Sequence, residues 1–339
     1  MQWLVAAAVF LAVSAVLWVV SLRINRRIER QVPINGRFLE VGGERLHYTD
    51  EGRGPALLMI HGLSGCGRNL THSLAPQLRE RFRVITLDRP GSGYSTRARG
   101  AAADLPAQAS LVAKFIRTLD LGQPLVLGHS LGGAVALSLA LDHPQSVSGL
   151  ILVAPLTHPQ RMLPWVFLSL GVRPAFLRRW MSLTLAAPMA MLGRRGLVKA
   201  IFAPDPVPED FAERGGGLLG MRSDNFYNAS SEIAVVNRAL PGMVKRYPSL
   251  KLPVGLIYGS ADSILNYRRH GEAMVGKVPG LQLEIVPGRG HMLPISAVER
   301  VVAMVEHIAA QAAPQRSATV LRHRAAPAVR GIPSRLGAL

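Results

Sequence analysis

A serine between two glycines is the residue of this chain whose surroundings best suit it for chemistry. In Gly128-His129-Ser130-Leu131-Gly132 it follows a short apolar run, Leu125–Leu127, and precedes an apolar helical pattern over 134–141. A strand that turns directly into a helix holds such a serine on a strained elbow, with its hydroxyl above the end of a sheet. The glycines let the strand and the helix approach closely enough for this turn. The pattern therefore predicts that Ser130 is a nucleophile.

A serine nucleophile needs a histidine to accept its proton and a carboxylate to orient that histidine. The buried strand pattern 253–258 ends in a loop with Asp262, and the alternating pattern 281–286 ends in a loop with His291. The carboxyl ends of parallel strands converge on one edge of a sheet, and the chain order serine, acid, histidine fits an elbow enzyme. We therefore expect Ser130, Asp262 and His291 to form a triad. The alternatives are an ordinary turn residue for Asp262 and a helix cap for His291.

A tetrahedral intermediate also needs donors for its oxyanion. In enzymes with this elbow, one donor is the backbone N–H after the nucleophile, here Leu131. The second comes from the loop after the third strand, where His61-Gly62-Leu63 follows the apolar run 56–60. Leu63 is the expected second donor, with His61 as a structural hydrogen-bonding residue.

These motifs resemble those of the α/β-hydrolase-fold serine hydrolases over about residues 36–312. The resemblance rests on His61-Gly62, the loop Asp88–Ser95, the elbow, Gly259–Asp262 and Gly290-His291. It implies an esterase-like or lipase-like enzyme with a helical lid, and a structural role for the Asp88–Ser95 loop.

The resemblance does not by itself determine the reaction. Relatives that open epoxides or cleave carbon–halogen bonds have an aspartate in place of Ser130. Hydrolases that cleave carbon–carbon bonds of meta-cleavage products usually have a tryptophan where this chain has Met292. The predicted activity is hydrolysis of lipophilic carboxylic esters through an acyl-enzyme, and charged esters are expected to be poor substrates. Carbon–carbon hydrolysis and non-catalytic ligand binding on the same scaffold are the alternatives.

The pattern of elements predicts an α/β fold, an eight-stranded and mostly parallel sheet with helices on both faces. The core is expected over 36–157 and 250–312, with a helical lid over 158–249 inserted after the sixth strand and a basic, disordered tail over 313–339. The expected strands are Phe38–Val41, Leu46–Thr49, Leu57–Ile60, Val84–Leu87, Leu125–Leu127, Val147–Val153, Val254–Tyr258 and Leu283–Val286.

The chain begins with an apolar run. From Trp3 to Val20 only Ser14 is polar, and no charged side chain precedes Arg23. Eighteen residues span about 27 Å as a helix, close to the thickness of a bilayer core. No basic residue precedes the run and no small-residue cleavage site ends it, as a secretory signal would require. We therefore expect a single-pass anchor over 1–22, with a cleaved signal as the alternative, and a basic linker over 23–35. The arginines of the linker would keep the catalytic domain on the cytoplasmic side.

The net charge of +18 is concentrated in three places. These are the linker, the tail and residues 143–204, which carry six arginines and one lysine without an acidic residue. Because the lid arginines alternate with aromatic and aliphatic side chains, an anionic membrane surface is a second candidate contact, beside a solvated lid face. No nucleic-acid-binding motif, metal-ligand spacing or phosphate-binding glycine loop occurs, so a small lipophilic ester and the membrane are the expected partners, with no cofactor or metal.

The single cysteine, Cys66, cannot form an internal disulfide. It lies near an expected helix start, where a thiolate is favoured. It lacks the elbow that Ser130 has, so no catalytic role is expected for it.

Overall fold

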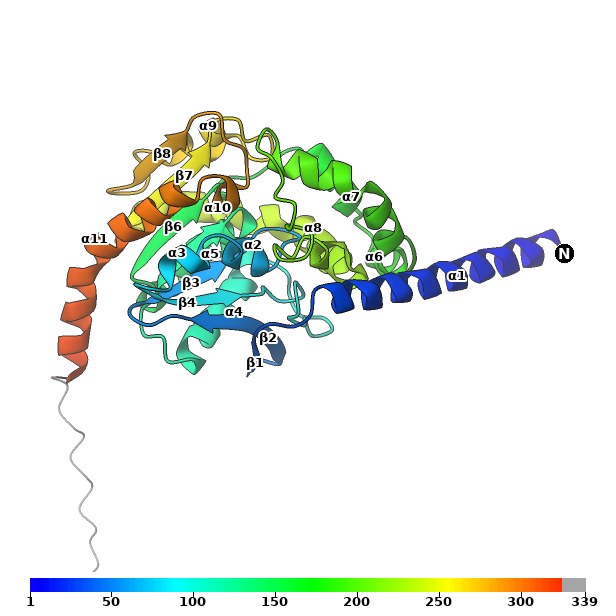
Figure 1. The fold of residues 1–339 in the computed structure, drawn as a ribbon, viewed down its shortest axis with the longest axis horizontal. Coiled ribbons are helices and arrows are strands. Elements are labelled where there is room, and N and C mark those ends of the chain that lie inside the picture. The colour runs from blue at the N-terminus through cyan, green and yellow to red at the C-terminus, as the bar shows by residue number, and fades with distance from the viewer. Residues whose placement is uncertain (325–339) are drawn as a thin grey trace, which may run out of the picture.

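Eight strands form one sheet in the order β1-β2-β4-β3-β5-β6-β7-β8 (Figure 1). The structure is a computed structural model, and it describes residues 1–324. The pairs β1–β2 and β2–β4 are antiparallel, and all other neighbours are parallel. The predicted eight-stranded, mostly parallel sheet is therefore confirmed. The strands are β1 (Arg37–Val41), β2 (Glu44–Glu51), β3 (Ala56–Ile60), β4 (Arg83–Leu87), β5 (Leu125–His129), β6 (Gly149–Val153), β7 (Val254–Gly259) and β8 (Gln282–Val286).

The two outer strands β1 and β2 form a hairpin through a two-residue turn. Gly42 and Gly43 both have positive φ angles, 61° and 84°. A turn of this kind needs positive φ at both central residues, which glycine adopts without strain. The pair Val41 and Glu44 therefore closes the hairpin in register.

Helices cover both faces of the sheet because successive side chains of the inner strands alternate between two apolar cores. Leu58 and Ile60 pack in one core, and Leu57 and Met59 pack in the other. Helices α4 (Leu105–Thr118) and α5 (Leu131–Asp142) contribute to the first core, and α2 (Arg68–Thr71), α3 (Ala75–Leu78), α10 (Leu293–Ser296) and α11 (Val298–Arg324) contribute to the second. The short helix α9 (Tyr267–His270) follows β7.

The segment between β6 and β7 is helical, as predicted for a lid after the sixth strand. Its main elements are α6 (Ala175–Met181), a π-helical turn (Ser182–Ala186), α7 (Ala187–Phe202) and α8 (Ser223–Arg246). Helix α8 continues through Pro241. The buried side chains of α8, such as Val236 and Leu240, join the first core, and this packing holds the lid over one end of the sheet.

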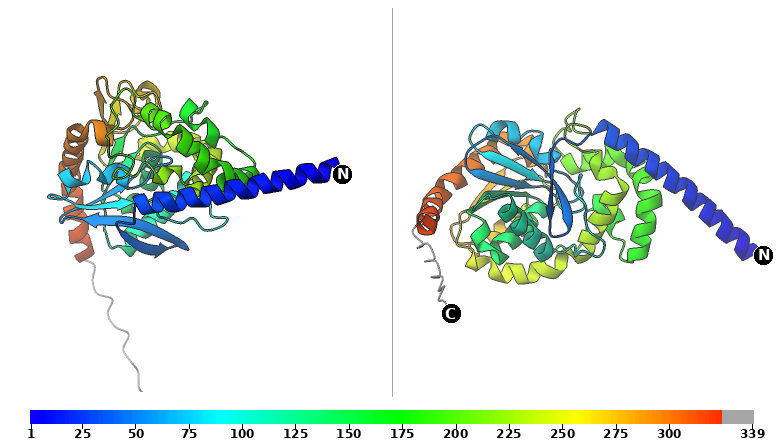
Figure 2. Two further views of the ribbon diagram at one scale, coloured as in Figure 1. Left: turned by 45° about the vertical axis from the view of Figure 1, so that its right-hand side comes forward. Right: turned by 90° about the horizontal axis from the view of Figure 1, so that it is seen from below.

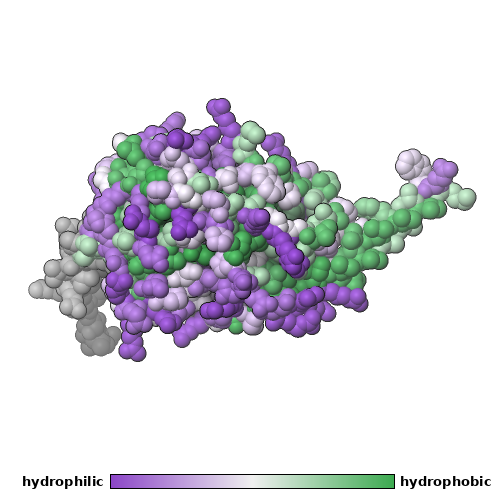
Figure 3. All heavy atoms as spheres, turned by 45° about the horizontal axis from the view of Figure 1, so that its top comes forward, coloured by the Kyte–Doolittle hydropathy of each residue, from purple (hydrophilic) through white to green (hydrophobic). Residues whose placement is uncertain are grey.

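Helix α1 (Gln2–Gln31) projects from the body and packs against the lid from Phe10 inward (Figures 1 and 2). Phe10 stacks on Trp180 with ring centroids 5.7 Å apart, and the Ser21 hydroxyl donates to the Thr184 carbonyl at 2.8 Å. By length and composition α1 could cross a membrane, with a mean hydropathy of 2.5 in its most apolar window. Most of its apolar side chains are exposed, and Figure 3 shows them as a continuous apolar surface along the projecting rod.

Two boundaries differ from the sequence interpretation. The residues expected as a linker from 23 onward continue α1 to Gln31, because Ile28 and Val32 bury completely against the body. Helix α11 extends to Arg324, so the first part of the expected disordered tail over 313–339 is helical. The rest of that tail, 325–339, lies outside the described residues.

Candidate active site

Ser130 lies at the sharp turn between β5 and α5. Its φ and ψ angles of 54° and −120° are outside the regions that L-residues favour. A Cβ atom at Gly128 would lie 2.6 Å from the Gly132 carbonyl oxygen, and one at Gly132 would lie 2.3 Å from the Ile60 carbonyl oxygen. These contacts leave no room for a side chain, so the glycines are what allow the strained turn at Ser130.

Asp262 and His291 lie in the loops that follow β7 and β8, and they form a hydrogen-bonded pair. The Nδ1 atom of His291 lies 2.7 Å from Oδ2 of Asp262, whose side chain is fully buried. The other carboxylate oxygen accepts the backbone N–H groups of Ile264 and Leu265 at 2.8 and 2.9 Å. Because an ionised carboxylate only accepts hydrogen bonds, His291 donates through Nδ1, which leaves Nε2 with its lone pair.

The structure brings His291 and Ser130 to one cavity of about 100 Å³, which Gly62 and Leu63 also line. Gly62 touches the nucleophile, since a Cβ atom there would lie 2.9 Å from Cβ and 3.4 Å from Oγ of Ser130. Leu131 is the first residue of α5, where helix geometry provides no acceptor for the backbone N–H. The two residues predicted as oxyanion donors, Leu63 and Leu131, thus flank Ser130.

His129 is a site residue that the sequence interpretation missed. Its Nε2 atom lies 3.1 Å from the backbone carbonyl oxygen of His291, and the two rings are 4.9 Å apart. Burial lowers the pKa of His129 to about 3, so it is neutral at physiological pH and donates to that carbonyl. It therefore ties β5 to the loop that carries His291. Its position directly before Ser130 was the available signal.

A buried arginine holds the loop after β3. The Arg89 side chain donates to the carbonyl oxygens of His61 and Gly62, each at 3.0 Å. The Arg89 backbone N–H donates to Nε2 of His61 at 2.9 Å, and burial lowers the pKa of this histidine to about 4. His61 is therefore a neutral structural residue, and the Asp88–Ser95 loop supports the site through Arg89.

The carboxylate that compensates Arg89 comes from the lid. Glu232 of α8 accepts two hydrogen bonds from Arg89, at 2.7 and 3.2 Å, and one from Arg97 at 2.9 Å. Burial by itself raises the pKa of Glu232, but the two guanidinium groups outweigh it and hold the pKa below its usual value. This bond network connects the lid to the loop beside Ser130.

A second connection joins the lid to the loop of His291. Asp205, which follows α7, accepts the backbone N–H of Gly290 at 2.8 Å and pairs with Arg289 at 3.0 Å. The side chain of Asp205 is 3% exposed. The residue beside the expected catalytic histidine is thus held by a lid carboxylate that the sequence interpretation did not single out.

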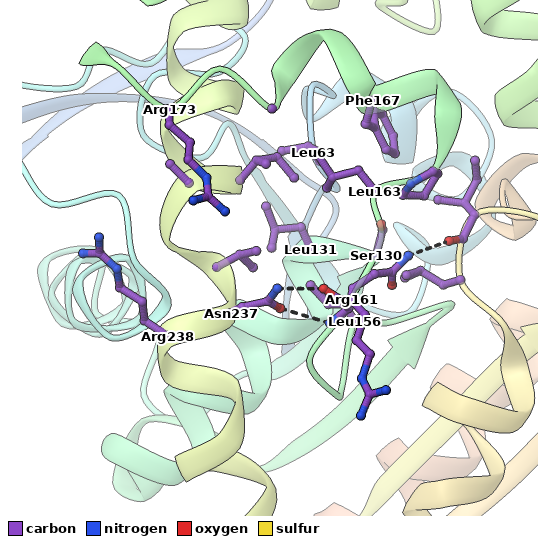
Figure 4. A pocket seen from close by; sticks show the side chains of 18 residues that line it. Leu63, Ser130, Leu131, Leu156, Arg161, Leu163, Phe167, Arg173, Asn237 and Arg238 are labelled. Carbon is purple, nitrogen blue, oxygen red and sulfur yellow. Dashed lines mark hydrogen bonds between the residues drawn. The ribbon is translucent and has the colours of Figure 1, made fainter.

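A larger cavity of about 530 Å³ opens beside Ser130 under the lid (Figure 4). Its wall is mainly apolar, and three arginines lie at its rim. Figure 4 shows Leu63, Leu131, Leu156, Leu163 and Phe167 around the space, with Arg173 and Arg238 on one side and Arg161 on the other.

Cys66 does not carry the thiolate character that its place near a helix start suggested. It is 1% exposed, and burial raises the pKa of its thiol to about 12. The following helix α2 spans only four residues, too short to offset that desolvation.

The sheet order, the elbow serine and the paired Asp262 and His291 define the class of an α/β enzyme with a nucleophile elbow. The family model for the alpha/beta hydrolase fold matches residues 55–298, so the chain belongs to that family. It is 28% identical over 281 residues to an uncharacterised protein of Mycobacterium tuberculosis, with 79% of each chain covered.

Solved structures share the fold. A putative lipase from Acinetobacter baumannii matches with a TM-score of 0.65 and 22% identity, over 86% of this chain and 97% of that one. A membrane phospholipase A matches with a TM-score of 0.58 and 20% identity, over 91% of this chain and 98% of that one. At these identities the likeness establishes the architecture, and the site must supply the argument for the reaction.

Proposed function

We propose that this hydrolase cleaves lipophilic carboxylic esters through a Ser130–His291–Asp262 triad. Ser130 Oγ attacks the ester carbonyl, His291 accepts its proton at Nε2, and Asp262 holds the opposite nitrogen as a donor. The backbone N–H groups of Leu63 and Leu131 would bind the oxyanion. The observation that carries the proposal is the 2.7 Å pair of His291 and Asp262, together with the strained turn that presents Ser130 to the same cavity.

The apolar wall of the 530 Å³ cavity supports an acyl chain as its occupant. Each buried methylene contributes about 0.8 kcal/mol, roughly a fourfold gain in binding. Esters with acyl chains of about six to ten carbons should therefore exceed acetate esters in kcat/KM by about two orders of magnitude.

Labelling with a fluorophosphonate tests the reaction. The wild-type protein should react and Ser130→Ala should not. The matched control is Ser110→Ala, at a half-buried serine of α4 that lines neither cavity beside Ser130. Retained labelling of Ser130→Ala would exclude this nucleophile. Turnover of vinylogous diketones without any ester turnover would show that the protein is a carbon–carbon hydrolase and not an esterase. Ligand binding without labelling would favour a non-catalytic accessory role.

The membrane is the second part of the proposal, with α1 as a single-pass anchor and the body on the cytoplasmic side. Its support is the exposed apolar surface of α1 and the arginines that follow it. The lid adds exposed apolar side chains next to α1, among them Trp165, Phe176 and Leu192, which are 68%, 78% and 83% exposed. Since Trp180 contacts Phe10 and Ser14, this part of the lid would lie at the depth of the apolar run.

Deletion of residues 1–22 tests the anchor, because the shortened protein should no longer sediment with membranes. Protease added to spheroplasts should spare the catalytic domain if it faces the cytoplasm. Digestion of that domain with the membrane intact would reverse the orientation.

A further inference from the structure

A second, larger cavity adjoins the one beside Ser130, and its character is different. It has a volume of about 910 Å³, and seven arginines line it against one carboxylate, that of Asp224. It shares Arg173, Ala234 and Arg238 with the apolar cavity. One ligand can therefore extend from the apolar space, across these residues, into a strongly cationic one.

Arg97 shows that the acceptors around this cationic space do not satisfy all of its guanidinium groups. Its side chain is only 6% exposed, and Nη2 donates to Glu232 and to the Pro90 carbonyl oxygen, both at 2.9 Å. Within the part of the chain whose side chains are described, Nε and Nη1 of Arg97 are buried without a hydrogen-bond partner. Glu232 accepts two hydrogen bonds from Arg89 and one from Nη2 of Arg97, and none from these two atoms. Buried donors of this kind require an acceptor, and a charged acceptor satisfies a guanidinium best.

The cavity also lies beside the segment of α1 that follows its apolar run. Arg222, which lines the cavity, pairs with Glu29 at 2.9 Å, and the Tyr94 hydroxyl donates to the Val32 carbonyl oxygen. Glu29 lies seven residues beyond Leu22, or about 10 Å along a helix. If α1 spans the bilayer, Glu29 lies just beyond the outer edge of the lipid headgroups, which extend about 5–8 Å beyond the hydrocarbon core. The opposite side of the cavity, at Arg179, lies toward the apolar run, because the neighbouring Trp180 contacts Phe10. The headgroup level therefore falls within the cavity.

We propose that the arginine cavity binds the phosphate group of a membrane lipid whose acyl ester lies at Ser130. The proposal rests on the ester hydrolysis proposed above and names its substrate class. A phosphate offers several anionic oxygens, and a guanidinium pairs with two of them at once. Water would cleave only the acyl C–O bond, releasing a fatty acid and the phosphate-bearing alcohol, so the phosphate is a recognition group. The expectation that charged esters are poor substrates then applies to charges outside this cavity.

A matched pair of substrates tests the recognition. Full-length protein in neutral detergent micelles would be assayed on decanoylglycerol and on decanoylglycerol 3-phosphate. The readout is the preference for the phosphate ester, which is its kcat/KM divided by that of the neutral ester. In the double variant Arg173→Gln/Arg238→Gln this preference should fall about tenfold or more, because the loss of one charged hydrogen bond weakens binding by at least that factor. The control Arg194→Gln/Arg195→Gln removes the same charge from the lid outside both cavities and should keep the wild-type ratio. An equal loss on both substrates, or no loss on either, would overturn the proposal.

A binding experiment separates this proposal from the proposed reaction. Ser130→Ala would be titrated with decylglycerol 3-phosphate, whose ether link cannot be hydrolysed, with decylglycerol, and with inorganic phosphate. The phosphate lipid should bind at least about tenfold more tightly than either of the others, since it alone occupies both cavities. Inorganic phosphate that binds as tightly as the lipid would assign the site to a soluble anion and overturn the proposal. If the wild type shows no ester turnover, the reaction fails, while this titration still decides the phosphate site.

Discussion

The α/β core and the lid meet at the site, but they hold its side chains by different means. In the core, backbone segments approach so closely that only glycine fits, as at Gly132 against Ile60. A Cβ atom at Gly259 would likewise lie 2.1 Å from the Arg289 carbonyl oxygen. The lid is connected through buried charges, Glu232 to Arg89 and Asp205 to the loop of His291. The core therefore sets the geometry of the site rigidly, whereas the lid acts on that geometry through a few bonds that single substitutions can remove.

The largest effect is expected in the core, from Asp262→Asn. The amide oxygen would keep the bonds from Ile264 and Leu265, and the amide NH2 would then face His291 and force Nδ1 to accept. The histidine would carry its proton on the wrong nitrogen, so kcat should fall by about 10⁴ while the fold is kept. Ester kinetics measure kcat and circular dichroism measures whether the fold is kept. Asp142→Asn at the end of α5 is the control. Full activity would mean that another carboxylate orients His291.

The next effect tests the lid's connection to Arg89. Glu232→Gln leaves a fully buried guanidinium without its charge partner, so the free energy of unfolding should fall by about 3–5 kcal/mol. Chemical denaturation of the detergent-solubilised protein measures it, and Glu209→Gln on the exposed lid surface is the control. Equal stability of the two variants would show that the lid carboxylate does not hold this network.

A smaller effect is expected where Asp205 of the lid bonds the loop of His291. Asp205→Asn weakens the charged hydrogen bonds to Arg289 and Gly290, which loosens the loop of His291. We expect kcat to fall about tenfold with KM little changed, because the change affects the orientation of a reacting group and leaves the pocket wall intact. Asp210 is a lid residue whose carboxylate bonds His72 of the core, and Asp210→Asn should behave as the wild type. A change in KM alone would assign Asp205 to binding.

The most gradual effect concerns the buried histidines of the core. His61 and His129 have pKa values of about 4 and 3 in the folded protein, against about 6.5 in the unfolded chain. Below pH 6.5 the unfolded state binds protons that the folded state does not, so stability falls as the pH is lowered from 6.5 toward 4. Each histidine lowers the free energy of unfolding by about 1.4 kcal/mol for each pH unit of this decrease.

Melting temperatures across this range measure the effect. His129→Gln keeps a donor for the His291 carbonyl. In this variant unfolding should take up about one proton fewer at low pH, so stability should fall less steeply as the pH is lowered. An unchanged melting temperature between pH 7 and pH 5 would contradict the neutral, buried state of these residues.

Much of the core could be predicted from the sequence because its signals are local. Each strand contains a short apolar run. Ser130 follows one such strand directly, and Asp262 and His291 lie in the loops after two others. Parallel strands bring their carboxyl ends to one edge, so the order of the runs was enough to place the three residues near one another. The helical lid was predictable on similar grounds, from its length and its lack of strand patterns.

The sequence by itself determined the strand order along the chain, the elbow and the apolar character of α1, because these follow from neighbouring residues. Only the tertiary structure decided which charges meet. Arg89 and Glu232 are 143 residues apart, and Asp205 and Gly290 are 85 apart. It also decided that Cys66 is buried and that seven arginines surround one cavity beside the site. The physical reason is that burial and long-range ion pairing depend on how the lid folds back over the sheet, which no local pattern encodes.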